Sequence, residues 1–422
     1  MSGIGNFDGL QGVVEVQCVL EVAERSPVPQ PYNCKPCPLC GSESFFPLIE
    51  RPKVPVLLNR VYDNPDDARR APVGKLDIVA CKDCHFVFNR AFQPNLITYD
   101  ANYDNDQTYS QTFEAHMSAM ARRVLDSLPR RGQVAILEVG CGQGQFLEEL
   151  QKQSFGRVAT CIGCDPAWRG SASLGTQIEP VPFDAFSNLP MMTKLDAIVC
   201  RHVIEHVPDP VGFLSAIRSS TPAGWTGRVF LETPSLEWIL LKDAYHDFYY
   251  EHCNYFSSDA LRLALARAGF GTEVIAAVFE GQYLVADAVR GEGPDTAAVG
   301  GGPLGSHVTD LRNRGDCFLA SWNELFARRR MAEPIAIWGA AAKGTTFANM
   351  FDPNAERISC LIDINPAKQR RFTPVTAHPI CSPSEAIERE VKTIIVMNPK
   401  YKAEIQETLL QTGAPAITLL DV

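Results

Sequence analysis

Long apolar runs are missing from this sequence. No stretch reaches the roughly 20 residues that cross a bilayer, so we expect no membrane span and no membrane partner. The first residues lack a basic region followed by an apolar core, so we also expect no secretory signal and a cytoplasmic protein. Positive charge is in deficit: 39 Lys and Arg face 49 Asp and Glu, a net charge of −10 at pH 7. That balance argues against a broad nucleic-acid surface, and we expect no nucleic-acid partner.

Cysteine is plentiful by contrast, with 14 in 422 residues. In a reducing cytosol disulfides are disfavoured, and paired C-x-x-C spacing indicates metal binding instead. Two such pairs occur, Cys37-Pro-Leu-Cys40 and Cys81-Lys-Asp-Cys84. Two thiolate knuckles suit a tetrahedral zinc site, and four protein ligands leave no open position for catalysis. We therefore predict structural Zn²⁺ held by Cys37, Cys40, Cys81 and Cys84.

The neighbours of these knuckles leave alternatives open. Cys34 comes three residues before Cys37 and competes with it as a ligand. Unliganded core cysteines are the other interpretation. His85 directly follows Cys84, and we interpret it as a packed neighbour rather than a ligand. Residues 41–80 separate the knuckles and must carry structure of their own.

The stretch 135–147, Ala-Ile-Leu-Glu-Val-Gly-Cys-Gly-Gln-Gly-Gln-Phe-Leu, predicts a buried strand, a tight turn and a helix start. Glycine suits that turn because it adopts φ angles that a Cβ blocks and lets a ligand approach bare backbone. The spacing is not the G-x-G-x-x-G dinucleotide fingerprint, because Gln145 stands where that pattern needs glycine. The residues that mark the turn are an acid and three alternate glycines: Glu138, Gly140, Gly142 and Gly144.

This E-x-G-x-G-x-G spacing resembles the first motif of class I S-adenosylmethionine (SAM) methyltransferases, and later landmarks match in order. Asp165 ends a second strand about 20 residues on, where a βαβ unit places a carboxylate for ribose hydroxyls. Asp184 and Phe186 follow at a third strand end, and a fourth strand leads into Arg201-His-Val-Ile-Glu-His206. A Rossmann-like domain for another ligand is the alternative. The resemblance implies SAM as cofactor, bound by Glu138, Gly140, Gly142, Gly144, Asp165, Asp184, Phe186 and His202, with His206 helping to shape the pocket.

A segment rich in proton-transfer groups follows the strand 227–234: His246-Asp-Phe-Tyr249-Tyr-Glu251-His252-Cys-Asn-Tyr-Phe256-Ser257. Together with the cysteine knuckles and the SAM motifs, it resembles the sugar C-methyltransferases, over about residues 34–420. That family acts on dTDP-linked 4-keto-deoxyhexoses. The resemblance implies that His252 is the general base for the carbon next to the ketone, and that the enolate attacks the SAM methyl. Tyr249 and Glu251 would orient the substrate or stabilise the enolate oxygen. A buried aromatic belt with an ordinary histidine is the alternative.

One segment departs from that family. Sugar C-methyltransferases carry a Gly-Gly pair with an arginine close behind, after the strand that ends here near Ala277. This chain has Phe279-Glu-Gly-Gln-Tyr-Leu284 instead. The departure leaves the sugar open, and a non-sugar natural-product intermediate is a second acceptor class. A non-catalytic zinc- and SAM-binding scaffold is a third interpretation, against which the Tyr249, Glu251 and His252 cluster argues.

The C-terminal part predicts a second open α/β sheet. Lys343 opens a helix after the small-residue turn Gly339-Ala-Ala-Ala, where it meets a substrate phosphate or lies on the surface; we favour the phosphate. The aromatic segment 99–116 is either a lid over the cofactor or a packed helix. The predicted fold is thus α/β, with a class I Rossmann-like methyltransferase domain, a small zinc-binding domain before it and a second Rossmann-like domain that helps to bind a small-molecule nucleotide-sugar. The predicted ranges are an N-terminal arm at 1–33, the zinc-binding domain at 34–98, the methyltransferase domain at 99–300 and the C-terminal domain at 301–422.

Overall fold

The computed structural model describes most of one compact unit, Cys34–Val422. The predicted arm 1–33, Cys34 and the third-strand positions Asp184 and Phe186 lie outside the described residues. The described ranges are 35–99, 103–130, 132–170, 176–181, 194–291, 304–328, 333–414 and 416–422.

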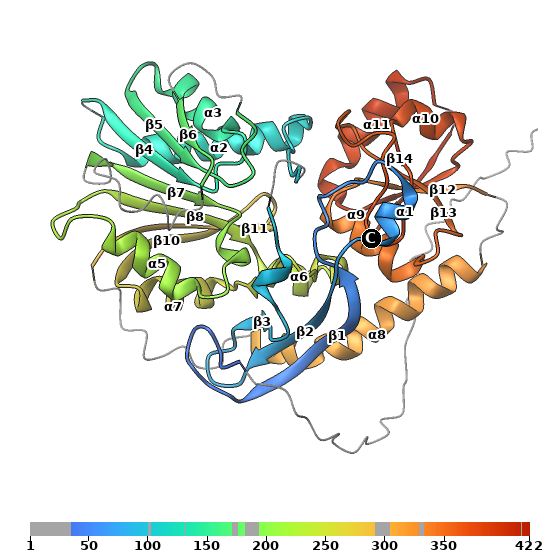
Figure 1. Cartoon of the computed structure of the whole chain (residues 1–422), viewed down its shortest axis with the longest axis horizontal. Helices are drawn as coiled ribbons and strands as arrows, with labels where there is room; N and C mark the ends of the chain where they lie inside the picture. The colour runs from blue at the N-terminus through green and yellow to red at the C-terminus, as the bar shows by residue number, and fades with distance from the viewer. Residues whose placement is uncertain are drawn as a thin grey trace, which may run out of the picture. The chain divides into compact units, whose positions relative to one another are not determined.

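A seven-stranded sheet forms the methyltransferase core, with the order β10-β11-β8-β7-β4-β5-β6 (Figure 1). Its strands β4 to β8 are parallel, and β11 is antiparallel to both of its neighbours. This mostly parallel sheet, with a glycine turn after β4, confirms the class I methyltransferase fold that the glycine motif predicted. Its strands are β4 (Val134–Val139), β5 (Val158–Cys164), β6 (Thr176–Glu179), β7 (Ala197–Arg201), β8 (Arg228–Pro234), β10 (Phe270–Val278) and β11 (Tyr283–Arg290).

Helices cover both faces of this sheet. Consecutive residues of β4 show the two sides: Ile136 packs in one apolar cluster and Leu137 in another. Because successive strand residues point to opposite faces, a strand covered on both faces is apolar throughout. The helices are α2 (Gln111–Ser127) and α3 (Gln145–Ser154) on the Ile136 side, and α5 (Pro210–Ser219) and α7 (Ser258–Arg267) on the Leu137 side.

A four-stranded antiparallel sheet contains the second cysteine knuckle and has the order β1-β2-β3-β9. Its edge strand β9 comes from far along the chain and pairs with β3. Tyr255 of β9 lies opposite Val87, and Asn254 lies opposite Phe88. The predicted domain ranges, 34–98, 99–300 and 301–422, remain a proposal. The strand β9 lies in the second range along the chain but pairs with the sheet of the first. The elements here are β1 (Phe45–Pro55), α1 (Pro65–Arg69), β2 (Val73–Cys81), β3 (Val87–Asn89), η1 (Pro94–Leu96) and β9 (Asn254–Tyr255).

The C-terminal sheet has five parallel strands in the order β14-β13-β12-β15-β16. Phe347 and Ile337 pack on one face, and Ile394 and Ile405 on the other. This confirms the second Rossmann-like domain. The strands are β12 (Ile335–Trp338), β13 (Ile358–Ile362), β14 (Ile380–Cys381), β15 (Thr393–Val396) and β16 (Thr418–Asp421), and the helices are α8 (Leu304–Arg328), α9 (Ala342–Phe351), α10 (Pro383–Glu388) and α11 (Lys402–Gln411).

Short helices follow the carboxyl ends of several strands. They are η3 (Ile204–His206) after β7, α6 (Leu236–Leu241) and η4 (Tyr245–Asp247) after β8, and η6 (Pro399–Tyr401) after β15. Among the helices that the structure describes, none has the length and hydrophobicity needed to cross a membrane.

Candidate active site

The glycine loop after β4 has the geometry of a ligand cradle. Gly140, Gly142 and Gly144 all have positive φ, at 70°, 56° and 90°. A Cβ on Gly140 would lie 2.2 Å from the Val203 side chain, whereas a Cβ on Gly142 would meet no atom within 4 Å. The first glycine therefore permits close packing, and the second faces open space where a ligand can approach the backbone.

Two acids flank this loop, as the sequence predicted. Glu138 is 2% exposed, and its Oε2 has no hydrogen-bond partner in the part of the chain that the structure describes. Burial raises the pKa of its carboxyl to about 8. Asp165 accepts hydrogen bonds from the backbone N–H of Gly142 at 2.8 Å and of Ala167 at 2.7 Å. An open cradle beside an orphaned buried oxygen fits a bound cofactor, so these residues suit SAM.

His202 follows β7 with a left-handed φ of 54°. Its ring lies edge-on to that of Tyr283, with ring centroids 4.7 Å apart. His202 also lines a cavity that the seven-stranded sheet and the C-terminal sheet share. Its Nε2 has no hydrogen-bond partner among the described residues and lies 3.8 Å from Glu232 Oε1. The strained backbone thus directs the imidazole toward the cavity, which agrees with the predicted pocket role.

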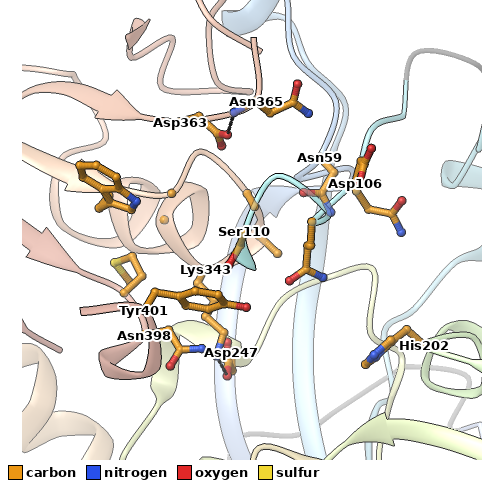
Figure 2. Close-up of a pocket in the computed structure, with 18 of the residues that line it drawn as sticks. Asn59, Asp106, Ser110, His202, Asp247, Lys343, Asp363, Asn365, Asn398 and Tyr401 are labelled. Atoms are coloured by element: carbon orange, nitrogen blue, oxygen red, sulfur yellow. Dashed lines mark hydrogen bonds and ion pairs between the residues drawn. The ribbon is translucent and has the colours of Figure 1, made fainter. Parts of the chain in front are cut away.

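A cavity of about 290 Å³ lies between the carboxyl ends of the two parallel sheets (Figure 2). His202 reaches it from the methyltransferase sheet, and Asp363 and Asn398 reach it from the C-terminal sheet. Ligands of open α/β sheets bind at this end, where the strand order reverses. Of the predicted SAM-binding residues that the structure describes, His202 lines this cavity, whereas Glu138, the three glycines and Asp165 do not.

Tyr249 and His252 form the centre of the predicted catalytic cluster. The Tyr249 hydroxyl and His252 Nε2 share a hydrogen bond of 3.2 Å, and both residues line the cavity. Burial lowers the pKa of His252 well below its ordinary value, and the neighbouring His206, His202 and Lys343 add to that shift. The imidazole is therefore neutral at pH 7 and able to accept a proton. Burial also raises the pKa of Tyr249 well above its ordinary value, so its phenol keeps the proton that it can donate.

Glu251 lies beside this pair with both carboxylate oxygens engaged. Oε2 accepts from the Tyr103 hydroxyl at 2.7 Å, and Oε1 accepts from the backbone N–H of Leu58. Asn59 donates in turn to the Tyr103 oxygen at 3.2 Å. Burial raises the pKa of Glu251. Its contacts connect the catalytic segment to the loop after β1, which indicates an orienting role.

The four-stranded sheet holds the catalytic segment in place. The Arg51 guanidinium on β1 donates to the carbonyls of Tyr245 and Phe248, at 2.9 and 3.0 Å. On the other side of His252, the Asn89 N–H donates to the Cys253 carbonyl at 2.8 Å. The predicted zinc-binding domain therefore positions the predicted base.

Two lysines of the C-terminal domain line the cavity. Lys343 Nζ donates to Asp247 Oδ2 at 2.6 Å and lies 4.5 Å above the Trp238 ring. Lys368 is only 3% exposed, and its ammonium has no hydrogen-bond or ion-pair partner among the described residues. The ammonium nitrogen itself is accessible from the cavity, where an anionic ligand can meet it.

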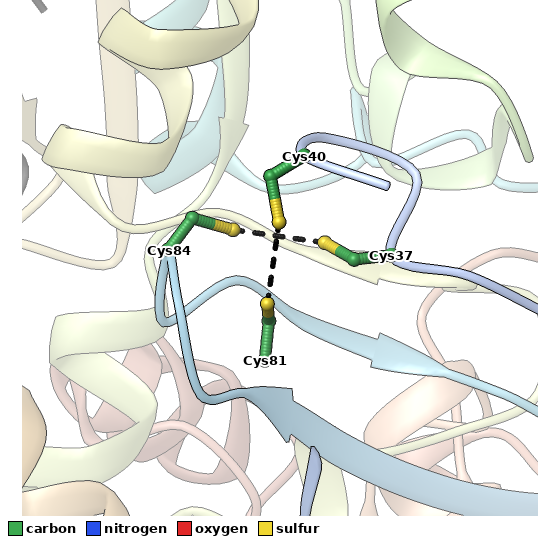
Figure 3. Close-up of side chains that lie close together, drawn as sticks. All are labelled: Cys37, Cys40, Cys81 and Cys84. Atoms are coloured by element: carbon green, nitrogen blue, oxygen red, sulfur yellow. Dashed lines mark hydrogen bonds between the residues drawn. The ribbon is translucent and has the colours of Figure 1, made fainter. Parts of the chain in front are cut away.

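The four cysteines of the two knuckles converge (Figure 3). Cys37 Sγ lies 3.6 Å from Cys84 Sγ, and Cys40 Sγ lies 3.4 Å from Cys81 Sγ. A tetrahedron with metal–sulfur distances of about 2.3 Å has edges of about 3.8 Å, so the set fits zinc. His85 occupies a left-handed turn position (φ 58°), and its N–H donates to the Cys81 carbonyl at 3.0 Å. It is not part of the cluster.

Sequence reasoning missed several groups around the cavity. Lys368 gave no signal, because neither its burial nor its lack of a partner can be read from the chain. Asp247 stood within the quoted catalytic segment but had no assigned partner, and Glu205 directly precedes His206. Tyr103 belongs to segment 99–116, whose described part both lines the cavity and leads into α2.

Comparisons with known families and curated proteins agree with this geometry. A family described as a methyltransferase domain matches residues 90–273, and a family described as a C-methyltransferase C-terminal domain matches residues 320–418. The C-methyltransferase NovU of Streptomyces niveus is 23% identical over 404 residues, which covers 89% of this chain and 93% of that protein. A ubiquinone biosynthesis O-methyltransferase of Aliivibrio fischeri is 30% identical over 102 residues, 23% of this chain and 43% of that protein.

Among solved structures, a SAM-dependent methyltransferase from Mesorhizobium loti is 15% identical. It aligns with a TM-score of 0.32 and covers 41% of this chain and 100% of that chain. The similarity to NovU runs through nearly the whole chain, whereas the O-methyltransferase matches only part of it.

Proposed function

We propose that this chain, a SAM-dependent methyltransferase with the C-terminal domain of C-methyltransferases, methylates a carbon next to a ketone. The substrate class that we propose is a nucleotide-linked keto-deoxy sugar. The observation that carries the proposal is the Tyr249–His252 pair, 3.2 Å apart in the cavity shared by both Rossmann-like sheets. A base in that place borders the glycine cradle's domain on one side and a second open sheet on the other.

In this proposal the His252 imidazole removes the proton from the substrate carbon. The Tyr249 phenol donates to the enolate oxygen, and Glu251 holds the segment through Tyr103 and Leu58. SAM, when bound, supplies a methyl group that its sulfonium already makes electrophilic, held by Glu138, the glycine loop, Asp165 and His202. Asp184 and Phe186 remain proposed adenine contacts. Most of the rate would come from generating the carbon nucleophile and aligning it.

The nucleotide part is proposed to lie at the C-terminal sheet. Lys343 and the unpartnered Lys368 can meet its phosphates, next to the carboxyl ends of β12 and β13. NovU, which is named a C-methyltransferase, supports the reaction type. In the segment that lacks the family's arginine, Phe279 and Tyr283 stack with ring centroids 5.2 Å apart, so an aromatic pair stands where that family carries a charge.

We also propose that Cys37, Cys40, Cys81 and Cys84 bind structural Zn²⁺. The four thiolates leave no open coordination position, so the ion would act by fixing the fold. Because Cys81 ends β2 and the sheet continues through β3 to β9, the ion would also steady the segment that carries His252.

The test of the base is deuterium exchange. The protein, saturated with S-adenosylhomocysteine, is incubated in D₂O with dTDP-, UDP-, GDP- and CDP-linked 4-keto-6-deoxyhexoses. One of them should take up deuterium next to the ketone, and His252→Asn should slow this at least about 100-fold. The variant should still bind S-adenosylhomocysteine within a few-fold. Exchange that survives in His252→Asn would refute the assigned base, and no exchange with any sugar would refute the substrate class.

A further inference from the structure

The carboxylates that line the cavity differ in the hydrogen bonds and ion pairs that compensate their negative charge. Glu251 and Asp363 use both oxygens in hydrogen bonds, and Asp247 pairs with Lys343 at 2.6 Å. Glu205 Oε2 accepts from Thr233 Oγ1 at 3.1 Å, but its Oε1 has no hydrogen-bond partner among the described residues. Asp247 Oδ1 also lacks a hydrogen-bond partner among the described residues, but Glu205 in addition has no lysine or arginine partner there.

Glu205 is 1% exposed and sits in η3, directly after β7. His202 Nδ1 lies 3.7 Å from Glu205 Oε1, beyond hydrogen-bond distance. One carboxylate oxygen of Glu205 and one ring nitrogen each of His206 and His252 all lie within 4.8 Å of one another. The Glu205 carboxylate, one oxygen of which has no hydrogen-bond partner among the described residues, therefore lies beside the proposed base.

The ring of His206 between them is fixed. Its Nδ1 lies 2.9 Å from the Tyr99 hydroxyl and 3.0 Å from the Glu251 carbonyl oxygen. The His206 and His252 rings meet edge to face, with centroids 4.7 Å apart. These contacts fix the His206 ring against His252, and the Thr233 hydroxyl holds the Glu205 carboxylate near both rings.

The surroundings of His252 otherwise disfavour a positive charge. Tyr249 and Tyr255 contact its ring, and His206, His202 and Lys343 lower its pKa in addition to burial. When His252 accepts a proton, an imidazolium forms where little water can reach it. A fixed negative charge nearby offsets that cost.

We propose that Glu205 is a positioning residue whose carboxylate stabilises the imidazolium formed on His252. The proposal rests on the proposed role of His252 as base. In that step the substrate C–H bond breaks, the proton moves to a ring nitrogen of His252, and the electron pair stays on the substrate as the enolate. Glu205 touches neither substrate nor cofactor in this account and acts through the charge of its carboxylate.

The test is a titration of the histidine rings by NMR in the full chain saturated with S-adenosylhomocysteine. The chain has 8 histidines, and the signal of His252 is assigned from its loss in His252→Asn. Glu205→Gln keeps the shape of the side chain and removes its charge. We expect it to lower the titration midpoint of His252 by at least about one pH unit, the size of a charge effect at 4–6 Å.

Two further variants make the result specific. Glu205→Asp keeps the charge, so its midpoint should stay nearer to that of the unmodified protein. Glu273→Gln removes a half-exposed carboxylate on β10 that pairs with Arg228, and it should change the midpoint by no more than a few tenths of a unit. A midpoint equal in Glu205→Gln and the unmodified protein would overturn the proposal.

This titration fails separately from the deuterium exchange. If deuterium exchange depends on His252 but the titration midpoint of His252 is the same with and without the Glu205 charge, only the proposed role of Glu205 is refuted. If the midpoint depends on Glu205 but exchange survives in His252→Asn, the assigned base falls instead, and the charge pairing stands as an electrostatic fact about the site.

Discussion

Lys343 has two roles to test: it pairs with Asp247 in the fold, and it is proposed to bind a substrate phosphate. Variants of this ion pair can separate the two roles. Lys343 Nζ and Asp247 Oδ2 lie 2.6 Å apart, with side chains 20% and 9% exposed. Asp247 Oδ1 already lacks a partner among the described residues, so Lys343→Met leaves a buried carboxylate with no partner at all. Breaking a buried pair in this way costs about 3–5 kcal/mol, and the partial exposure of Lys343 places the expected loss near about 3 kcal/mol.

Calorimetry of the full chain with S-adenosylhomocysteine measures this loss. We expect Lys343→Met to lower Tm by about 3–4 °C, and the double variant with Asp247→Asn to recover most of it, because no unpaired charge remains. Adding a nucleoside diphosphate should raise the Tm of neither variant, because both lack the Lys343 ammonium. This should hold even where the double variant is itself stable. Lys402→Met, which breaks a half-exposed pair with Asp421, should cost under about 1 kcal/mol. The Tm of this variant should still rise when a nucleoside diphosphate is added. A single variant as stable as the unmodified protein, or a double variant no better than the single, would refute the reasoning.

Three further predictions concern other parts of the molecule. Cys84→Ser should lose the bound zinc and unfold much of the chain, whereas Cys360→Ser in the other sheet should keep one zinc per chain by elemental analysis; a folded, active Cys84→Ser without metal would contradict the zinc proposal. Asp352 accepts from His378 and from three backbone N–H groups, which lower its pKa to about 2. This depressed pKa contributes about 2 kcal/mol above pH 4, lost as pH falls toward 2, so Asp352→Asn should speed amide exchange in 356–358 at pH 7 and far less at pH 2. Gly142→Ala, at φ 56°, should weaken S-adenosylhomocysteine binding at least about 10-fold by calorimetry, since the new methyl occupies the open side of the loop; unchanged affinity would place the cofactor elsewhere.

Local patterns carried the parts of the fold that the sequence could predict. The glycine loop, the strand-end acid Asp165 and the two cysteine knuckles each depend on residues a few positions apart, and the structure arranges them as expected. The second α/β sheet followed from three apolar runs, at 335–338, 360–362 and 393–397; the first leads into a small-residue turn and the second into an acid. Such features depend on backbone geometry that neighbouring residues decide.

Long-range contacts could not be predicted in this way. The strand β9 has two residues, too few to show a period, and its pairing with β3 is decided by tertiary packing. The same holds for Glu251, whose oxygens are taken by Tyr103 and Leu58, and for Lys368, whose burial comes from distant parts of the chain. Burial and partnership are properties of the folded chain, so the sequence could nominate Tyr249 and His252 but not the residues that support them.

The most direct test of the central claim is the position of the transferred methyl group. The protein is incubated with SAM labelled with carbon-13 in its methyl group and with the keto sugar that shows exchange, and the product is examined by NMR. The account predicts one labelled methyl bonded to the carbon next to the ketone, and none with His252→Asn. A label on oxygen or nitrogen, or an equal yield from His252→Asn, would contradict it.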